Sequence, residues 1–124
     1  MEPHTSMKAA AILFSVTALG GIAMALMRFR GTPRPPSWIV VVHGLLAASG
    51  LIVLIYAALT VGLPIMGSVA LGLFILAALG GASINFFFHS KKLPLPISMI
   101  IGHALIATTG LILLLISILI HCFI

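Results

Sequence analysis

Acidic residues are almost absent from this chain: Glu2 is the only one, against six lysines and arginines and five histidines. No apolar stretch therefore contains a carboxylate, and the chain cannot assemble the nucleophile, base and acid of a hydrolytic or transfer site. A proton-coupled exporter of cations is also disfavoured, because such proteins use an acid inside the membrane. The sequence argues against a chain that is an enzyme on its own.

Cysteine is nearly absent as well. Cys122 is the only one, so no disulfide framework can form within the chain. No Cys-x-x-Cys-His sequence is present, which excludes the covalent attachment of a c-type haem.

Apolar residues dominate what remains. Of the 124 residues, 62% are hydrophobic and 6% are charged, and the mean hydropathy is +1.37. This composition predicts an integral membrane protein whose first partner is the lipid bilayer, and the length predicts one domain over residues 1–124. The net charge of +5 does not indicate nucleic acid, because the cations do not alternate with stacking aromatic residues.

Four apolar runs are long enough to cross a bilayer, which takes about 20 residues in a helix. They cover roughly residues 8–27, 38–60, 65–88 and 95–120, and proline-containing segments separate them. A signal peptide is the alternative for the first run. We expect this run to be retained, because its segment LFSVTALGG recurs sixty residues later as LFILAALGG.

Basic residues set the expected orientation. Five of the six lie in the first and third breaks, and Lys8 is the exception. Since cytoplasmic segments carry the excess of lysine and arginine, both termini should lie outside, in an inner or plasma membrane.

A second pair of related segments extends the repeat. HGLLAASGLIVL begins at His43, and HALIATTGLILL begins at His103. The fold class predicted is therefore an all-α membrane protein of four transmembrane helices, built from two tandem two-helix repeats over about 9–60 and 69–120. A pseudo-two-fold axis along the membrane normal would relate the repeats and place both histidines at one depth, about 10 Å into the bilayer.

These two histidines are the candidate metal ligands. An ionisable side chain at this depth is costly, and it indicates function by default. Two neutral imidazoles that face each other can hold one haem iron from both sides. Arg28 and Arg34, on the nearer surface, are candidates to bind the propionates.

Small residues surround the candidate ligands. Small side chains would leave room for a porphyrin, although they also serve simple helix packing. On the ligand helices they are Ala47, Gly50, Ala107 and Gly110, and on the other two helices they are Gly20, Gly21, Gly80 and Gly81.

Histidines on the second and fourth helices, with glycines on the first and third, resemble the haem-binding core of membrane b-type cytochromes. The resemblance implies an electron-transfer subunit that works with quinol or within a larger redox complex. Members of that family carry a further histidine about four turns along each ligand helix, whereas this chain has Ala57 and Ser117 there. The resemblance thus implies one bis-histidine haem b.

A cofactor-free accessory subunit, which packs against a larger complex through its small residues, is the alternative function. The remaining histidines, His4, His89 and His121, have no histidine sixty residues away and indicate no second site. A carrier of divalent metal ions would lack ligands, since two histidines fall short of the usual three or four.

Overall fold

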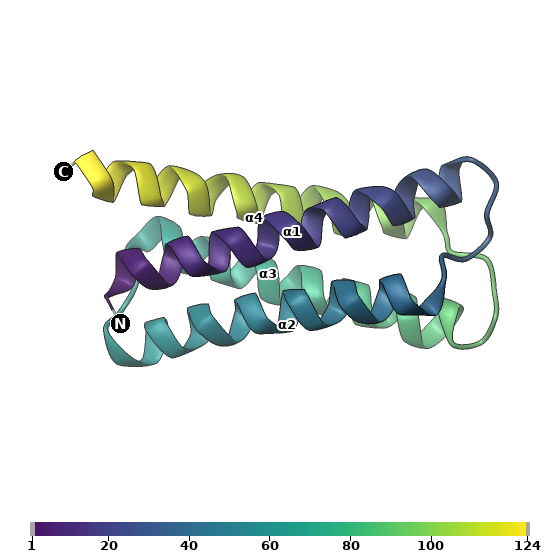
Figure 1. Cartoon of the computed structure of the whole chain (residues 1–124), viewed down its shortest axis with the longest axis horizontal. Coiled ribbons are helices and arrows are strands. Elements are labelled where there is room, and N and C mark those ends of the chain that lie inside the picture. The colour runs from purple at the N-terminus through teal and green to yellow at the C-terminus, as the bar shows by residue number, and fades with distance from the viewer. Residues whose placement is uncertain (1, 124) are drawn as a thin grey trace.

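The computed structural model describes residues 2–123, and it consists of long helices joined by short turns (Figure 1). The helices are α1 (Pro3–Phe29), α2 (Ser37–Thr60), α3 (Ile65–Ile84), which continues into the π-helical turn η1 (Asn85–His89), and α4 (Ile97–Phe123). No strand occurs within the described range. Residues 2–123 contain four helices that are long and apolar enough to span a membrane, as predicted, and the all-helical class is confirmed.

Prolines explain where the four long helices begin, and Pro96 directly precedes α4. Pro3 lies in the first turn of α1, and Pro36 and Pro64 directly precede α2 and α3. Proline suits the start of a helix because its missing N–H would be unpaired there in any case. α1 is longer than the apolar run of roughly 8–27, because the helix continues back past Lys8 to Pro3.

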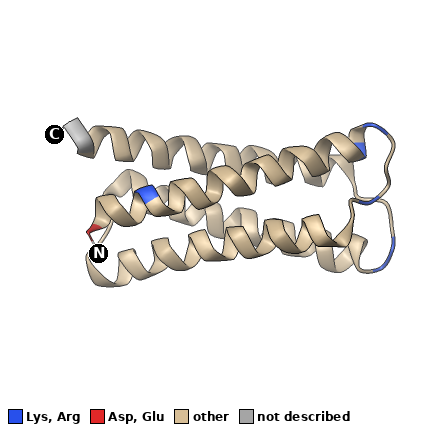
Figure 2. Cartoon of the chain, in the orientation of Figure 1, with Lys and Arg blue, Asp and Glu red and all other residues tan. Residues whose placement is uncertain are grey.

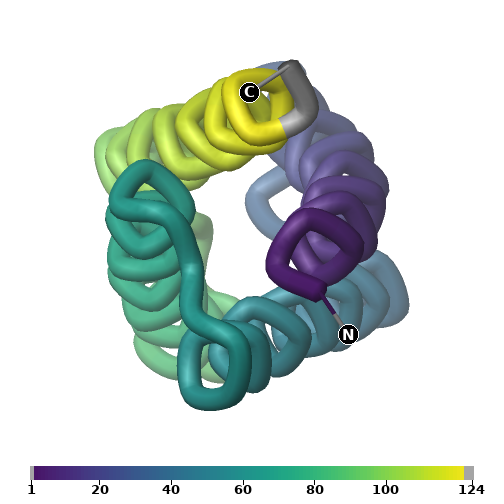
Figure 3. The backbone as a smooth tube through the Cα atoms, turned by 90° about the vertical axis from the view of Figure 1, so that its left-hand side faces the viewer, coloured from purple at the N-terminus to yellow at the C-terminus, as the bar shows by residue number. Residues whose placement is uncertain are grey.

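Each helix packs against the next one along the chain, and α4 returns to pack against α1 (Figure 3). The start of α1 and the described end of α4 lie at the same end of the bundle, together with the turn formed by residues 61–64 (Figure 1). The 30–36 and 90–96 loops lie at the opposite end. Figure 2 places most of the basic residues at this loop end and Lys8 near the other.

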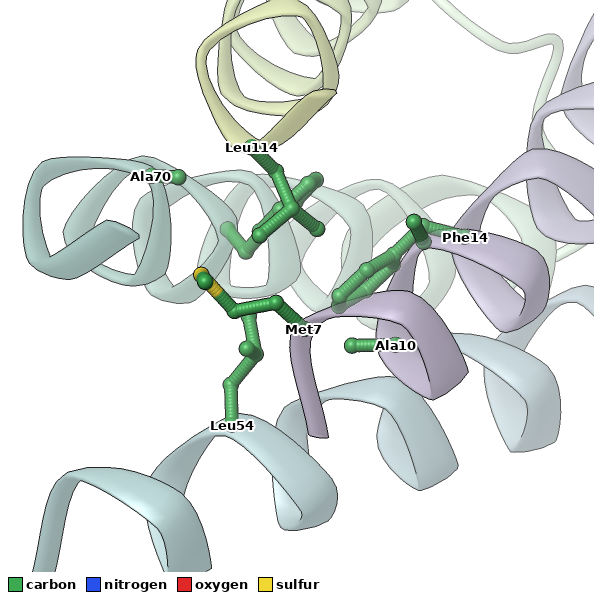
Figure 4. Packing of buried hydrophobic residues seen from close by; sticks show 8 residues of the cluster. Met7, Ala10, Phe14, Leu54, Ala70 and Leu114 are labelled. Atoms are coloured by element: carbon green, nitrogen blue, oxygen red, sulfur yellow. The ribbon is translucent and has the colours of Figure 1, made fainter. Parts of the chain in front are cut away.

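The close-packed core lies in the half of the bundle nearer the termini. Met7, Phe14, Leu54 and Leu114 converge there from three helices (Figure 4). The rings of Phe14 and Phe74 stack with centroids 3.8 Å apart and planes 9° from parallel. Lipid tails are as apolar as these side chains, so the hydrophobic effect does not drive the helices together within the membrane. The core stabilises the bundle through close van der Waals packing.

Fully buried residues are much rarer toward the loop end. No residue of α1 after Thr17 is fully buried, and α2 has none before Gly50. Among the described residues of this half, the buried ones are Pro35, Ile84 and Leu95, and the last two are still 9% and 7% exposed.

Side chains and backbone join the two basic loops directly. Arg28 Nε donates to the carbonyl of Leu95 over 2.9 Å, and His89 Nε2 donates to the carbonyl of Pro35 over 2.9 Å. The backbone N–H of Leu95 also donates to Pro33 O over 3.1 Å. Pro35 and Leu95 lie sixty residues apart. The carbonyl of Leu95, in the second loop, accepts from the end of α1, and the carbonyl of Pro35, in the first loop, accepts from the end of η1.

Candidate functional site

The rings of His43 and His103 meet inside the loop half of the bundle. They come from α2 and α4, which lie at opposite corners of the four-helix ring (Figure 3). Their ring centroids are 6.2 Å apart, and their planes are inclined at 67°. The structure thus brings together the two residues that the repeated sequence singles out.

One of the two rings is held by a hydrogen bond to the neighbouring helix. His43 Nδ1 lies 2.9 Å from the backbone carbonyl of Thr17 in α1. A carbonyl can only accept, so Nδ1 carries the hydrogen and the neutral ring keeps a lone pair on Nε2. The Thr17 hydroxyl is engaged elsewhere, since it donates to Leu13 O over 2.7 Å.

The second ring lies in the corresponding place but is less firmly held. His103 Nδ1 is buried and has no hydrogen-bond partner within the structure. The carbonyl of Ala77 is close to this nitrogen, but the two do not meet hydrogen-bond geometry. Ala77 follows Thr17 by sixty residues, so both histidines turn Nδ1 toward the equivalent carbonyl of the preceding helix.

Paired glycines provide the space for the two imidazoles. A Cβ atom at Gly21 would lie 3.1 Å from His43 Cε1, and one at Gly81 would lie 3.1 Å from His103 Cε1. Gly20 and Gly80 are less crowded, because their Cβ atoms would lie 3.8 Å from the nearer Nδ1. The backbone of each glycine pair therefore forms the surface on which a histidine ring rests.

Two other candidate glycines contact aromatic rings. A Cβ at Gly50 would come within 2.8 Å of the Phe14 ring, and one at Gly110 within 3.2 Å of the Phe74 ring. Both glycines thus belong to the close-packed core, about 10 Å along the helices from the histidines at 1.5 Å per residue. Ala47 and Ala107 lie between these layers and are half-buried.

The two candidate arginines differ in what they contact. Arg28 is bonded to the Leu95 carbonyl, whereas Arg34 is a half-exposed residue of the first loop. The bonds of Arg28 and His89 to the opposite loops were not predicted from the sequence. The sixty-residue spacing of Pro35 and Leu95 was the only sequence signal for these bonds. Neither residue has a polar side chain, so neither suggests a hydrogen-bond acceptor.

No cluster of three or more histidine, cysteine or acidic residues able to hold a metal ion occurs in the described residues. His43 and His103 form a pair, which is smaller than such a cluster. No protein-family model, curated protein or solved structure matches the chain.

Proposed function

We propose that this chain is a membrane-embedded b-type cytochrome, or the haem-bearing anchor subunit of a larger redox complex. It exchanges electrons with a redox partner or with quinol. His43 and His103 would hold the iron of one haem b, each through a ring nitrogen. The observation that carries the proposal is the meeting of two histidine rings from opposite helices, 6.2 Å apart, inside an apolar bundle.

The donor set fits a haem in number and chemistry. Histidine nitrogens bind metal ions at about 2 Å, and the two ring centroids are 6.2 Å apart, so both rings could reach one ion between them. The Nδ1–H of His43 is bonded to a carbonyl, which is the usual way in which a ligating histidine is oriented. Because a porphyrin provides four ligands of its own, two histidines complete the coordination of the iron.

Haem supplies one-electron transfer at its iron when it is bound. The residues of this chain hold and orient the cofactor, and the apolar helices exclude water from it. The Thr17 carbonyl fixes the tautomer of His43, and the glycine pairs support both rings. Arg34 can pair with a propionate from the loop end, whereas the Nε–H of Arg28 is already bonded to Leu95.

The proposal includes a repeated architecture of two tandem two-helix units, with a pseudo-two-fold axis along the membrane normal. Several contacts recur at a spacing of sixty residues and support it: the Phe14–Phe74 and His43–His103 pairs, and the matching glycine contacts at Gly21 and Gly81. The fully buried pair Leu54 and Leu114 has the same spacing.

An outside location of both termini, in an inner or plasma membrane, is the orientation that the basic loops favour. Single cysteines at Thr32 or Ser90, in a Cys122→Ser background, should be shielded from an impermeant thiol reagent in intact cells. Both positions are exposed at the loop end, so lysed cells should label fully. Labelling of both cysteines in intact cells would reverse the orientation.

An absorption spectrum tests the cofactor. The purified protein, reduced with dithionite, should show the sharp split bands of a six-coordinate low-spin haem b. His43→Ala and His103→Ala should each abolish the bands or convert them to a five-coordinate form.

His89→Ala, at the loop end, is the control and should keep the spectrum. A protein that contains no haem, and that assembles fully with both core histidines replaced, would contradict the cytochrome. The cofactor-free accessory subunit would then be favoured, with the glycine contacts serving helix packing alone.

A further inference from the structure

A second group of polar side chains lines a cleft of about 440 Å³ at the end of the bundle where α1 begins. Its polar lining residues are Glu2, His4 and His121, and the neighbouring wall is formed by Met7 and the 61–64 turn. The chain's only carboxylate and two of its five histidines thus meet in one cleft, far from the His43–His103 pair.

Hydrogen-bond acceptors predominate among these groups. His121 Nδ1 donates to the Ser117 carbonyl over 2.8 Å, so the lone pair of its neutral ring lies on Nε2. Glu2 contributes a carboxylate, which only accepts when it is ionised. His4 Nε2 is buried and has no hydrogen-bond partner in the structure. The cleft therefore suits a headgroup that donates hydrogen bonds and carries positive charge.

An apolar groove of about 520 Å³ adjoins the cleft. Pro64 and His121 line both, and Val69, Leu113 and Ile120 continue the groove along α3 and α4. Val69 and Ile120 lie among the residues exposed along these helices. A molecule with a polar head in the cleft can therefore extend an acyl chain along the groove toward the membrane interior.

One cation, Lys8, lies on α1 toward this end of the bundle, although it does not line the cleft itself. Lys8 is the only lysine or arginine outside the loop region, and it is exposed on α1 (Figure 2). It follows His4 by four residues, so both lie on one face of the helix. This end of the bundle thus presents a cation near an acceptor-rich cleft, which complements a zwitterion of phosphate and ammonium.

We propose that this end of the bundle binds one phospholipid with a primary ammonium headgroup, of the phosphatidylethanolamine class. The ammonium donates to Glu2 and His121, the phosphate pairs with Lys8, and an acyl chain follows the apolar groove. A choline headgroup has no N–H and cannot make these bonds, so the site discriminates between two zwitterionic lipids of similar charge. The proposal does not depend on haem binding.

Native mass spectrometry of the full chain tests this inference. The protein is equilibrated in detergent micelles that contain equal amounts of phosphatidylethanolamine, phosphatidylcholine and phosphatidylglycerol with identical acyl chains. We expect one phosphatidylethanolamine to be retained about ten-fold over phosphatidylcholine, because a lost hydrogen bond to a charged group has an effect of this order. Glu2→Gln combined with His121→Leu should remove the preference.

Lys92→Gln is the matched control, because it removes a charge at the opposite end and should leave the preference intact. Circular dichroism verifies that each variant keeps its helices. Equal retention of the three lipids would overturn the proposal, as would a preference for phosphatidylglycerol. A preference for phosphatidylethanolamine that survives the double substitution would also overturn it, since another surface would then bind the lipid.

Discussion

The half of the bundle nearer the termini and the half nearer the 30–36 and 90–96 loops are formed by the same long helices, yet they differ in packing. Toward the termini, the stacked Phe14 and Phe74 rings are enclosed by fully buried side chains. Toward the loops, His43 and His103 meet at 6.2 Å among residues that remain partly accessible. The first half holds the helices together, and the second half places polar groups where a ligand can be held.

Glycine has a different partner in each half. Gly50 admits a phenyl ring of the core, whereas Gly21 admits an imidazole. Substitutions in the first half should therefore reduce stability and leave the site chemistry intact. Substitutions in the second half should alter the site with little loss of stability.

The largest effect is expected from Phe14→Ala. Phe14 is 6% exposed and stacks on Phe74, so its removal leaves a void at the centre of the core. We expect a loss of about 3 kcal/mol in the free energy of unfolding, at the lower end of the range for Phe→Ala in close-packed cores. Reversible unfolding in mixed micelles, followed by circular dichroism, measures it.

Phe86→Ala is the matched control for this change. Phe86 is 69% exposed, so its replacement should change the stability little. Equal losses from the two substitutions would show that the stacked pair does not hold the bundle together.

An intermediate effect is expected from Gly50→Ala. The added methyl group would come within 2.8 Å of the Phe14 ring, so helix or ring must shift. Overpacking of this kind costs about 1–3 kcal/mol. Gly44→Ala lies on the same helix with nothing within 4 Å of the added atom, so it isolates the clash from the change in helix propensity. Similar unfolding midpoints for the two variants would argue against a close-packed Gly50.

Hydropathy predicted the spans because it is a local feature of the sequence, whereas the meeting of His43 with His103 was predicted from the sixty-residue spacing, which suggests equal depth on two helices. The π-helical turn at 85–89 was not predicted, since its sequence NFFFH continues the apolar pattern of α3 without a break. The bonds of Arg28 and His89 to the opposite loops were not predicted, because every residue has a backbone carbonyl and the sequence does not indicate which one accepts.

The glycines were only partly understood from sequence. Their small size predicted space near the histidine layer, but sequence cannot tell what occupies that space. The structure assigns it to imidazole at Gly21 and Gly81 and to phenyl at Gly50 and Gly110. Which neighbour a glycine admits depends on the rotation of each helix about its axis, which packing fixes.

The smallest change in stability, with the most specific change at the site, is expected from Gly21→Ala. The new methyl group would lie 3.1 Å from His43 Cε1, so the ring must move by a few tenths of an ångström. That movement disturbs the Nδ1–H bond to Thr17 and the direction of Nε2. The unfolding free energy should change by less than about 1 kcal/mol, because an exchange of one methyl contact is small beside a core deletion. The reduced bands of the proposed haem should broaden or lose intensity.

Gly20→Ala is the control on the same turn: its methyl group would lie 3.8 Å from His43 Nδ1, an ordinary contact, and should leave the spectrum unchanged. Nitrogen-15 NMR of labelled histidine provides a readout that needs no cofactor, since the His43 Nδ1 resonance should shift in the first variant alone. Matching spectra and resonances in the two variants would mean that Gly21 does not support the His43 ring.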